Sequence, residues 1–367
     1  MDSKKVGILT FHTALNYGAV LQTFALQNFL SELNIHNEII NYRCPFIDKN
    51  YSPFFISDGK IINAVIRGIL FGRTIRIKRR NFNKFIEHYL DMTQPYYSSE
   101  EIEKDKNKYS FFISGSDQVW SPITAGFDPV YFLPFANDNQ KYSYAASIGT
   151  DKLSDEQLDE YGKRLKGFQF LSVRENSAQK ILAGLDSDRE VFVHADPTLL
   201  LGRENWDQLC GEIPDHIPGD YLLLFNVEKP ILDVNFAKKV ANERGLKVVY
   251  INERTIKKDK DIIYLEGLSP DVFLRLFANA KIVVTNSFHG TVFSIIFQKE
   301  FYVEIENKKQ RNVRIEDLLK ELEICRADIN EYDLCKDRKI DWECVSQILE
   351  RKRADAAQYF IKIVENI

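Results

Sequence analysis

The chain has 367 residues, of which 44% are hydrophobic, and this length is long for one core and comfortable for two domains. The formal net charge of −4 gives no reason to expect a nucleic-acid-binding protein. The five cysteines are odd in number and lack CxxC spacing, which is typical of reduced thiols and argues against a disulfide frame or a zinc site.

The first stretch of the chain has the pattern of a βαβ unit. An apolar strand at Val6–Thr10 leads into a turn that carries Asn16, Tyr17 and Gly18, then into a helix and a second strand at Ile35–Ile40. The junction lacks GxGxxG, which argues against a dinucleotide cofactor. No secretory leader precedes the strand, and no apolar run reaches the ~20 residues that span a bilayer. We therefore predict a cytoplasmic protein.

Residues 61–90 differ in character from the rest of the chain. Basic and apolar residues alternate there in the pattern of an amphipathic helix or helix pair. Such a segment can lie on anionic lipid or bind a charged acceptor. It can equally be a solvated helical face, which is the commoner case for a run of charges. The basic residues are Arg67, Arg73, Arg76, Lys78, Arg79, Arg80 and Lys84.

A buried strand is predicted at Tyr109–Ile113, and small polar residues follow it. Open α/β sheets bind ligands at the carboxyl ends of their strands, so Ser116, Asp117 and Gln118 are candidates for a site. Asp117 is equally suited to cap the next turn through an Asx hydrogen bond.

Two successive α/β series of similar size follow the chain. This pattern predicts two doubly wound domains whose strand ends face a shared cleft. We expect an N-terminal domain at 1–205 that includes the basic helical insertion 61–90, a C-terminal domain at 206–340, and a final helix at 341–367.

The stretch from Ala280 to Ser294 is the strongest candidate for the centre of the chemistry. A buried strand at Ile282–Val284 is followed by a turn in which Ser287 or Thr285 can cap the next helix, leaving N–H groups for an anion. His289 lies in this turn, where it can bind a phosphate or carry a proton, and Gly290 allows close approach of the backbone. A histidine that only bonds a backbone carbonyl is the other interpretation.

Six short motifs, in this order along the chain, resemble the polysaccharide pyruvyl transferase family. They span most of the chain, from about residue 5 to about residue 320, and as a series they are fairly specific. The motifs are Asn16-Tyr17-Gly18, Ser114-Gly115-Ser116-Asp117-Gln118-Val119-Trp120, Ala146-Ser147-Ile148-Gly149, Ser172-Val173-Arg174-Glu175, Asp196-Pro197-Thr198 and Thr285-Asn286-Ser287-Phe288-His289-Gly290.

The resemblance implies a fold like the two-domain glycosyltransferase B class, with Rossmann-like domains. It also implies a reaction that needs no cofactor. The enolpyruvyl group of phosphoenolpyruvate would pass to two hydroxyls of a sugar as a cyclic ketal, with release of phosphate. The acceptor would belong to a surface polysaccharide, such as an exopolysaccharide or capsule, or to its lipid-linked precursor. Contact of 61–90 with the inner face of the membrane would fit such an acceptor.

The resemblance also implies roles for individual residues. His289 would bind the donor and act as an acid, and Arg174 would clamp the donor's carboxylate or phosphate, together with Ser287 and Gly290. Many members have arginine where Ser287 stands, and an acidic residue where Ala19 follows the first-loop glycine. The donor site could therefore recruit Arg311 and Arg314.

We assign Asp117 as the general base near the acceptor, and we expect the acceptor to contact the first two motifs. The reaction requires no metal, and we expect none. The predicted acceptor-binding residues are Asn16, Tyr17, Gly18, Ser116, Asp117 and Gln118.

Two other functions fit the same residues. A nucleotide-sugar glycosyltransferase with the same two domains would bind a diphosphate, and a non-catalytic relative would bind glycans alone. The acceptor sugar and the oligomeric state are not encoded in any motif that we can read.

Overall fold

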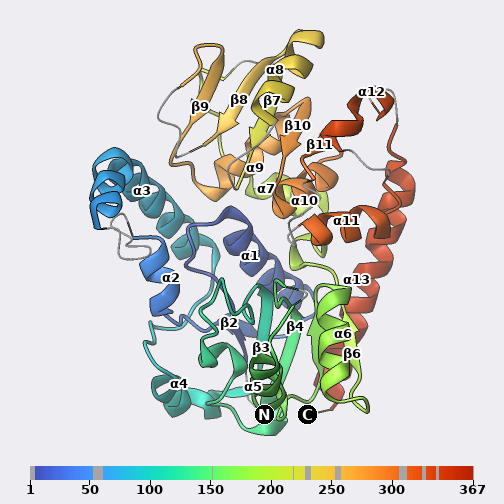
Figure 1. Cartoon of the computed structure of the whole chain (residues 1–367). Helices are drawn as coiled ribbons and strands as arrows, with labels where there is room; N and C mark the ends of the chain where they lie inside the picture. Colours follow the sequence, from blue (N-terminus) through green and yellow to red (C-terminus); the bar gives the residue numbers. More distant parts are fainter. Residues whose placement is uncertain are drawn as a thin grey trace. The chain divides into compact units, whose positions relative to one another are not determined.

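The computed structural model describes residues 5–52, 61–150, 152–217, 219–227, 233–252, 258–305, 312–324, 328–335 and 339–366. The chain divides into two units. The first comprises Met1–Ser52, Ile86–Leu201 and Leu349–Ile367, and the second comprises Pro53–Phe85 and Gly202–Ile348. Each unit is built on a parallel β-sheet of its own (Figure 1).

The sheet of the first unit has six parallel strands in the order β2-β1-β3-β4-β5-β6. The central strands of this sheet are buried on both faces, since helices cover each face. This is the usual condition of a parallel sheet. The strands are β1 (Lys5–Leu9), β2 (Asn37–Ile39), β3 (Tyr109–Asp117), β4 (Lys141–Ala146), β5 (Leu171–Val173) and β6 (Val191–Val193).

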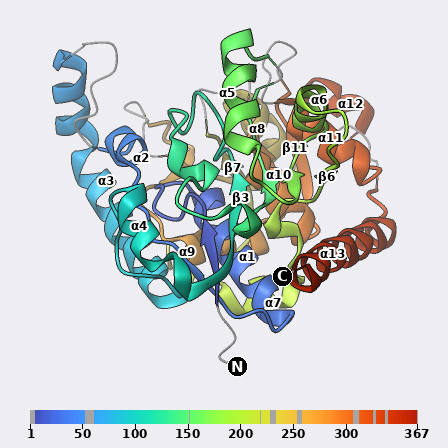
Figure 2. The ribbon, with the colours of Figure 1, turned by 90° about the horizontal axis from the view of Figure 1, so that it is seen from below.

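Helices cover both faces of this first sheet (Figure 2). On one face lie α1 (Tyr17–Glu32) and the last part of α13 (Trp342–Glu365), where the Tyr359 hydroxyl donates to the Ser143 carbonyl at 2.7 Å. On the other face lie α5 (Asp155–Leu165) and α6 (Asn176–Leu185). Two short helices, α2 (Pro45–Asn50) and α4 (Ser99–Asp105), belong to the same unit.

The sheet of the second unit has five parallel strands in the order β11-β10-β7-β8-β9. Its core is built from alternate residues of the central strands, among them Leu222, Leu224, Val248 and Val284. The strands are β7 (Tyr221–Phe225), β8 (Lys247–Ile251), β9 (Ile262–Leu265), β10 (Ile282–Thr285) and β11 (Glu300–Val303). The helices are α7 (Arg203–Leu209), α8 (Asp233–Glu243), α9 (Pro270–Asn279), α10 (Phe288–Ile296), α11 (Asn312–Glu321) and α12 (Tyr332–Cys335).

The predicted fold class of two parallel α/β domains is confirmed, and the final helix has the expected bounds. One difference concerns β3, which was expected to end at Ile113 but continues to Asp117. Ser114, Gly115 and Asp117 still pair with β4. Residues of low β-propensity remain in the sheet because the neighbouring strand supplies backbone partners.

Residues 61–90, predicted to form one helix or two, form the single helix α3 (Ile61–Tyr89). The sequence analysis placed this segment in the N-terminal domain, whereas Pro53–Phe85 group with the second unit. The contacts explain the grouping: the Thr74 hydroxyl donates to Glu266 Oε2 at 3.1 Å, and Asn81 Nδ2 donates to the Gly267 carbonyl at 2.7 Å. No helix in the described part of the chain is both long and apolar enough to cross a membrane.

Candidate functional site

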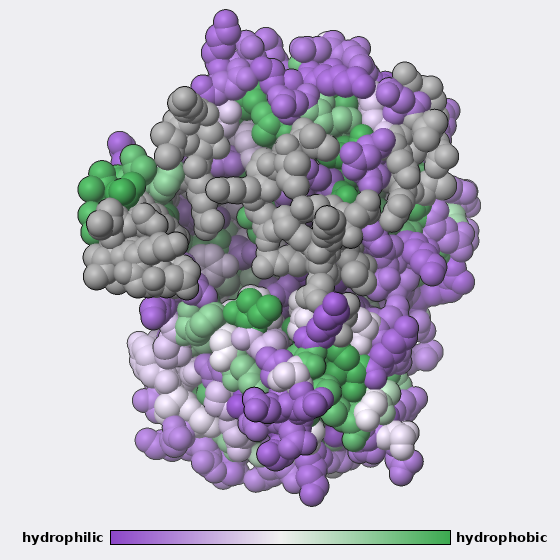
Figure 3. Space-filling model, in the orientation of Figure 1, coloured by the Kyte–Doolittle hydropathy of each residue, from purple (hydrophilic) through white to green (hydrophobic). Residues whose placement is uncertain are grey.

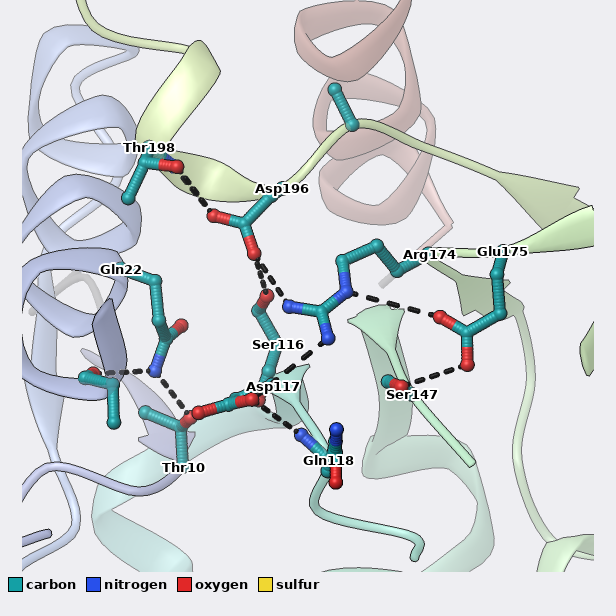
Figure 4. A network of polar contacts seen from close by, with 12 residues as sticks. Thr10, Gln22, Ser116, Asp117, Gln118, Ser147, Arg174, Glu175, Asp196 and Thr198 are labelled. Atoms are coloured by element: carbon teal, nitrogen blue, oxygen red, sulfur yellow. Dashed lines mark hydrogen bonds and ion pairs between the residues drawn. The ribbon is translucent and has the colours of Figure 1, made fainter. Parts of the chain in front are cut away.

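Polar side chains converge at the carboxyl edge of the first sheet, where five neighbouring strands end (Figure 4). Each strand or the loop after it contributes to one buried network. The contributing residues are Thr10 after β1, Ser116 and Asp117 on β3, Ser147 after β4, Arg174 and Glu175 after β5, and Asp196 and Thr198 after β6. Parallel α/β sheets bind their ligands at this edge.

Arg174 lies in the middle of this network with three carboxylates around it. Its Nη1 atom donates to Asp196 Oδ2 at 2.7 Å, and its Nη2 and Nε atoms lie 3.8 Å from Asp117 Oδ1 and Glu175 Oε2. Its side chain is only 3% exposed. Burial alone lowers the pKa of Arg174, but the charges of Asp196, Asp117 and Glu175 raise it above its usual value.

Glu175 and Asp196 are held by further donors. Glu175 Oε1 accepts from the Ser147 hydroxyl at 2.7 Å and from the backbone N–H groups of Ile148 and Gly149 at 3.2 and 3.3 Å. Asp196 Oδ1 accepts from the Thr198 hydroxyl at 2.6 Å and its N–H at 3.0 Å. Both carboxylates are therefore buried members of the network, and in each of them the Oδ1 or Oε1 atom is held by several donors.

Asp117 is the carboxylate of this group that remains accessible. Its side chain is 15% exposed, against 4% for Glu175 and 0% for Asp196. Its Oδ1 atom accepts from the N–H of the next residue, Gln118, at 2.9 Å and lies 3.8 Å from Arg174 Nη2; the predicted Asx bond would instead join it to an N–H two residues on. Within the described residues, Oδ2 has no hydrogen-bond or ion-pair partner.

The backbone is strained beside Asp117. Asp117 has a φ of 63°, and Ala145 on the neighbouring strand has a φ of 47°. Residues other than glycine adopt this region rarely, and such positions cluster at functional sites because the surrounding structure must hold them there. The strain identifies the ends of β3 and β4 as the most constrained part of this edge.

The first-loop candidates lie at the start of α1, after β1. Asn16 is the N-cap of the helix and accepts from the Ala19 N–H at 3.3 Å, while Tyr17 and Gly18 are buried. The helix reaches the network through Gln22, whose Nε2 atom donates to the Thr10 hydroxyl at 2.8 Å. Thr10 in turn donates to the Ser116 carbonyl at 3.0 Å.

The second group of candidates lies in the second unit, where β10 leads into α10. Of the two predicted caps, Ser287 is the N-cap of α10, and its hydroxyl accepts from the Gly290 N–H at 3.2 Å. His289 was expected in the loop before the helix but lies in the helix's first turn. It is half-buried, and the centre of its ring is 5.2 Å from the centre of the Phe288 ring. The positive end of the helix dipole therefore points toward His289 and its neighbours.

Gly290 is required by packing within the protein. A Cβ atom at this position would collide with Thr285 Oγ1 on β10. That hydroxyl is already engaged, because it donates to the Phe225 carbonyl at 2.6 Å and accepts from the Ser287 N–H at 3.1 Å. The glycine thus allows α10 to lie directly on its strand; a contact of Gly290 with a ligand stays a prediction.

Of the two arginines predicted to assist the donor site, Arg314 lies near it. Its guanidinium carbon is 5.8 Å from the centre of the ring of Phe288, the first residue of α10. Arg311 lies outside the described residues. No group of three or more His, Cys, Asp or Glu side chains in the described ranges is arranged to hold a metal ion.

The sequence matches the family model for polysaccharide pyruvyl transferase over residues 16–304. The chain belongs to the polysaccharide pyruvyl transferase family. The match covers all the strand-end residues described above except Thr10, which supports assignment of a transferase of this family. Comparison with curated proteins found no significant match.

Solved structures similar to this pyruvyl transferase family member include UDP-N-acetylglucosamine 2-epimerases. A putative one from Listeria monocytogenes has a TM-score of 0.56 at 12% identity, covering 98% of this chain and 97% of that chain. The Neisseria meningitidis enzyme bound to UDP-GlcNAc has a TM-score of 0.51 at 10% identity, covering 99% of each chain. These likenesses show the fold alone, which is of the glycosyltransferase-B-like class.

Sequence reasoning did not identify Glu175, Asp196 and Gln22 as members of the site. A usable signal was present for two of them, because Glu175 and Asp196 each follow a short predicted strand. Applying the strand-end rule to every strand would have found them. Gln22 lies within a helix that is otherwise almost entirely buried, and a buried glutamine on such a helix is itself a sign of a polar network.

Proposed function

We propose that this protein transfers the enolpyruvyl group of phosphoenolpyruvate to two hydroxyls of one sugar in a surface polysaccharide or its lipid-linked precursor. The match to the family model over residues 16–304 carries this proposal. In the reaction, the methylene carbon of the donor gains a proton and the bond between C2 and the phosphate oxygen breaks. Two sugar oxygens bond to C2, and the second hydroxyl proton leaves with phosphate.

The start of α10 supports the donor part of the proposal. Phosphoenolpyruvate carries a carboxylate and a phosphate, and its site needs cations and N–H donors. The N-terminus of α10 and the imidazole of His289 provide groups of this kind, and Arg314 on α11 places its guanidinium beside the ring of Phe288, the first residue of α10. We assign His289 as donor ligand and as the acid that protonates the methylene carbon.

The network in the first unit supports the acceptor part. Asp117 has an accessible carboxylate at the carboxyl edge of the sheet, and a base that accepts a proton from a sugar hydroxyl needs such a position. A positioned base contributes about 10²–10⁴-fold to the rate. Gln118 lies next to this carboxylate and is partly exposed, so it would bind a neighbouring hydroxyl of the sugar, whereas Ser116 is fully buried and would support the network from within.

The structure also suggests a different role for Arg174 from the predicted donor clamp. Asp196, Glu175 and Asp117 surround this single arginine, so the local formal charge is negative and does not favour an anionic donor. We assign Arg174 as a positioning residue that holds Asp117 in place through their ion pair. Asp196 in turn fixes the guanidinium from the opposite side.

The test is release of phosphate from phosphoenolpyruvate, combined with a mass increase of a sugar from an acceptor library. Asp117→Asn preserves the shape of the side chain, and asparagine tolerates the positive φ at this position, so the variant should fold. We expect its phosphate release to fall at least about 100-fold. Asp159→Asn, on the exposed surface of α5, is the matched control and should retain wild-type turnover. Wild-type turnover by Asp117→Asn would refute the assignment of the base.

A further inference from the structure

The outer face of α3 carries exposed apolar side chains near its start and exposed basic side chains after them. Val65, Ile66, Ile69 and Leu70 are all exposed near its start, and the exposed fraction of Ile69 reaches 76%. Hydrophobic residues gather at this end of the helix in the space-filling view, at the left (Figure 3). We name these four residues the apolar tip. Several large apolar side chains that lie exposed side by side usually mark a contact surface.

Basic residues continue the same face of the helix after the apolar tip. Arg73, Arg76, Arg80 and Lys84 are exposed and follow Ile66 and Ile69 at intervals of three or four residues, which places them on one stripe. We name these four residues the basic collar. Residues 61–89 contain seven lysines and arginines and one glutamate, so the helix carries a formal charge of +6. Since the whole chain carries −4, the remainder carries −10.

The inner face of α3 packs against the rest of the second unit. The outer stripe is therefore exposed on a helix that is itself held in place by contacts. Phe82 and Phe85 are buried, and Thr74 and Asn81 hydrogen-bond to the loop at Glu266 and Gly267. The stripe is thus presented to its surroundings by a fixed support.

We propose that α3 docks the protein onto a bilayer that contains anionic lipid, with the apolar tip inserted and the basic collar at the phosphate groups. From Val65 to Leu70 the helix rises about 8 Å. From Arg73 to Lys84 it rises about 17 Å, which keeps the collar outside the hydrocarbon. Apolar residues predominate at the start of α3, where Arg67 is the one basic residue between Val65 and Leu70, and basic residues predominate after it, which favours entry tip first. This proposal does not depend on the reaction proposed above.

Vesicle flotation tests this docking. We expect the full chain to float with vesicles of phosphatidylcholine that contain about one third phosphatidylglycerol, to stay unbound with phosphatidylcholine alone, and to be released by salt. These wild-type measurements need no variant. Absence of flotation, or equal flotation with both vesicles, would overturn the proposal, and a protein partner would then be the better occupant of the stripe.

Variants separate the two parts of the surface. Arg73→Glu/Arg76→Glu/Arg80→Glu should weaken binding at least about tenfold. Lys104→Glu/Lys180→Glu/Lys260→Glu, which makes the same change of charge at exposed sites elsewhere, should retain most of the binding. Ile66→Ser/Ile69→Ser should also weaken it, whereas Ile123→Ser, at an exposed isoleucine far along the chain, should not. Equal effects of test and control variants would contradict a dedicated surface.

The fluorescence of Ile69→Trp distinguishes insertion from loose attraction. With anionic vesicles, its emission should shift to the blue and be quenched by brominated acyl chains, while that of Arg80→Trp should not. Identical behaviour of the two would contradict entry by the tip. Phosphate release with a water-soluble acceptor should stay unchanged in all α3 variants, so a failure of docking is distinguishable from a failure of the proposed reaction.

Discussion

At the scale of single residues, the environment of a side chain decides what it can do. Arg174 has a guanidinium suited to bind two oxygens of a ligand, and the family resemblance predicts that role. In the fold its charge is matched by protein carboxylates, and Asp196 takes one of its donors at 2.7 Å. Asp117 instead keeps an accessible oxygen. We therefore propose that the chemistry of the site centres on Asp117, with Arg174 as its support.

The burial of Arg174 predicts a large cost when it is removed. Arg174→Ala leaves Asp196 and Glu175 buried without their cation. We expect it to lower the free energy of unfolding by about 3–5 kcal/mol, measured by urea titration. Arg203→Ala, which breaks the exposed pair with Asp207, is the control and should change it by less than about 1 kcal/mol. Equal values for the two variants would contradict the network.

A second residue-scale prediction concerns the half-buried histidine next to the network. His194 Nδ1 lies 2.7 Å from the Ser172 hydroxyl, and its ring stacks on Tyr144 and Phe192. Burial, together with the charge of Lys352, lowers the pKa of His194 to about 4. The folded state thus favours the neutral ring, while the unfolded chain binds a proton below its ordinary pKa of about 6.5.

The sign of the pH dependence follows from this difference. The contribution of His194 to stability is fully present above pH ~6.5 and is lost as the pH falls toward the folded pKa of about 4. Between pH 7 and pH ~4.5, wild type should lose about 2–3 kcal/mol more than His194→Gln. His216→Gln, at an exposed histidine, should behave as wild type. Parallel pH profiles for wild type and His194→Gln would rule this out.

At the scale of elements, the placement of α10 depends on one close contact with its strand. Ser287 caps the helix, and Gly290 allows it to contact β10. His289 lies between these two residues, so their contacts fix the position of its backbone. A helix start can serve an anion only if its first turn is held in position, because the N–H groups must point at one place. The small residues of this motif are therefore explained by packing as much as by ligand binding.

The test of this element is Gly290→Ala. The added methyl group meets Thr285 Oγ1, so we expect a loss of about 1–3 kcal/mol in the free energy of unfolding and a rise in the KM for phosphoenolpyruvate. Gly184→Ala in α6 makes the same substitution where nothing lies within 4 Å, and it should be neutral or stabilising. Adding Thr285→Ala should partly restore the Gly290→Ala protein. A stabilised Gly290→Ala variant would refute the packing argument.

At the scale of the whole molecule, the family match extends across residues of both units, and each unit has the parallel sheet of a ligand-binding domain. The solved structures with this fold include proteins bound to UDP-GlcNAc, at identities near 10%. Fold therefore does not choose between phosphoenolpyruvate and a nucleotide sugar. That choice belongs to the chemistry of the donor site.

Ligand-induced stabilisation makes the choice measurable. Phosphoenolpyruvate at about 100 times its Kd should raise the free energy of unfolding of the full chain by ~2.7 kcal/mol. The shift should be smaller in His289→Ala, and UDP-GlcNAc at the same concentration should produce none. Thermal denaturation reads out both. Stabilisation by the nucleotide sugar alone would favour a glycosyltransferase, and binding of acceptor sugars without phosphate release would favour a glycan-binding relative.

The sequence by itself determined the succession of strands and helices, the two α/β series, and the cap and strand around Ser287. These features depend on local patterns of apolar residues and on turn chemistry, which neighbouring residues carry. The family motifs added the reaction class. The same local information predicted the bounds of α13 correctly.

Only the tertiary structure decided how Arg174 is used and which carboxylate remains accessible. Asp117, Glu175 and Asp196 lie far apart in the chain, and they meet because β3, β4, β5 and β6 are neighbours in one parallel sheet. The order of strands is set by packing of the whole unit, so no local pattern contains it. The exposure of the apolar tip could not be predicted from the sequence for the same reason. A helical pattern shows which face is apolar but not which face is covered by the rest of the fold.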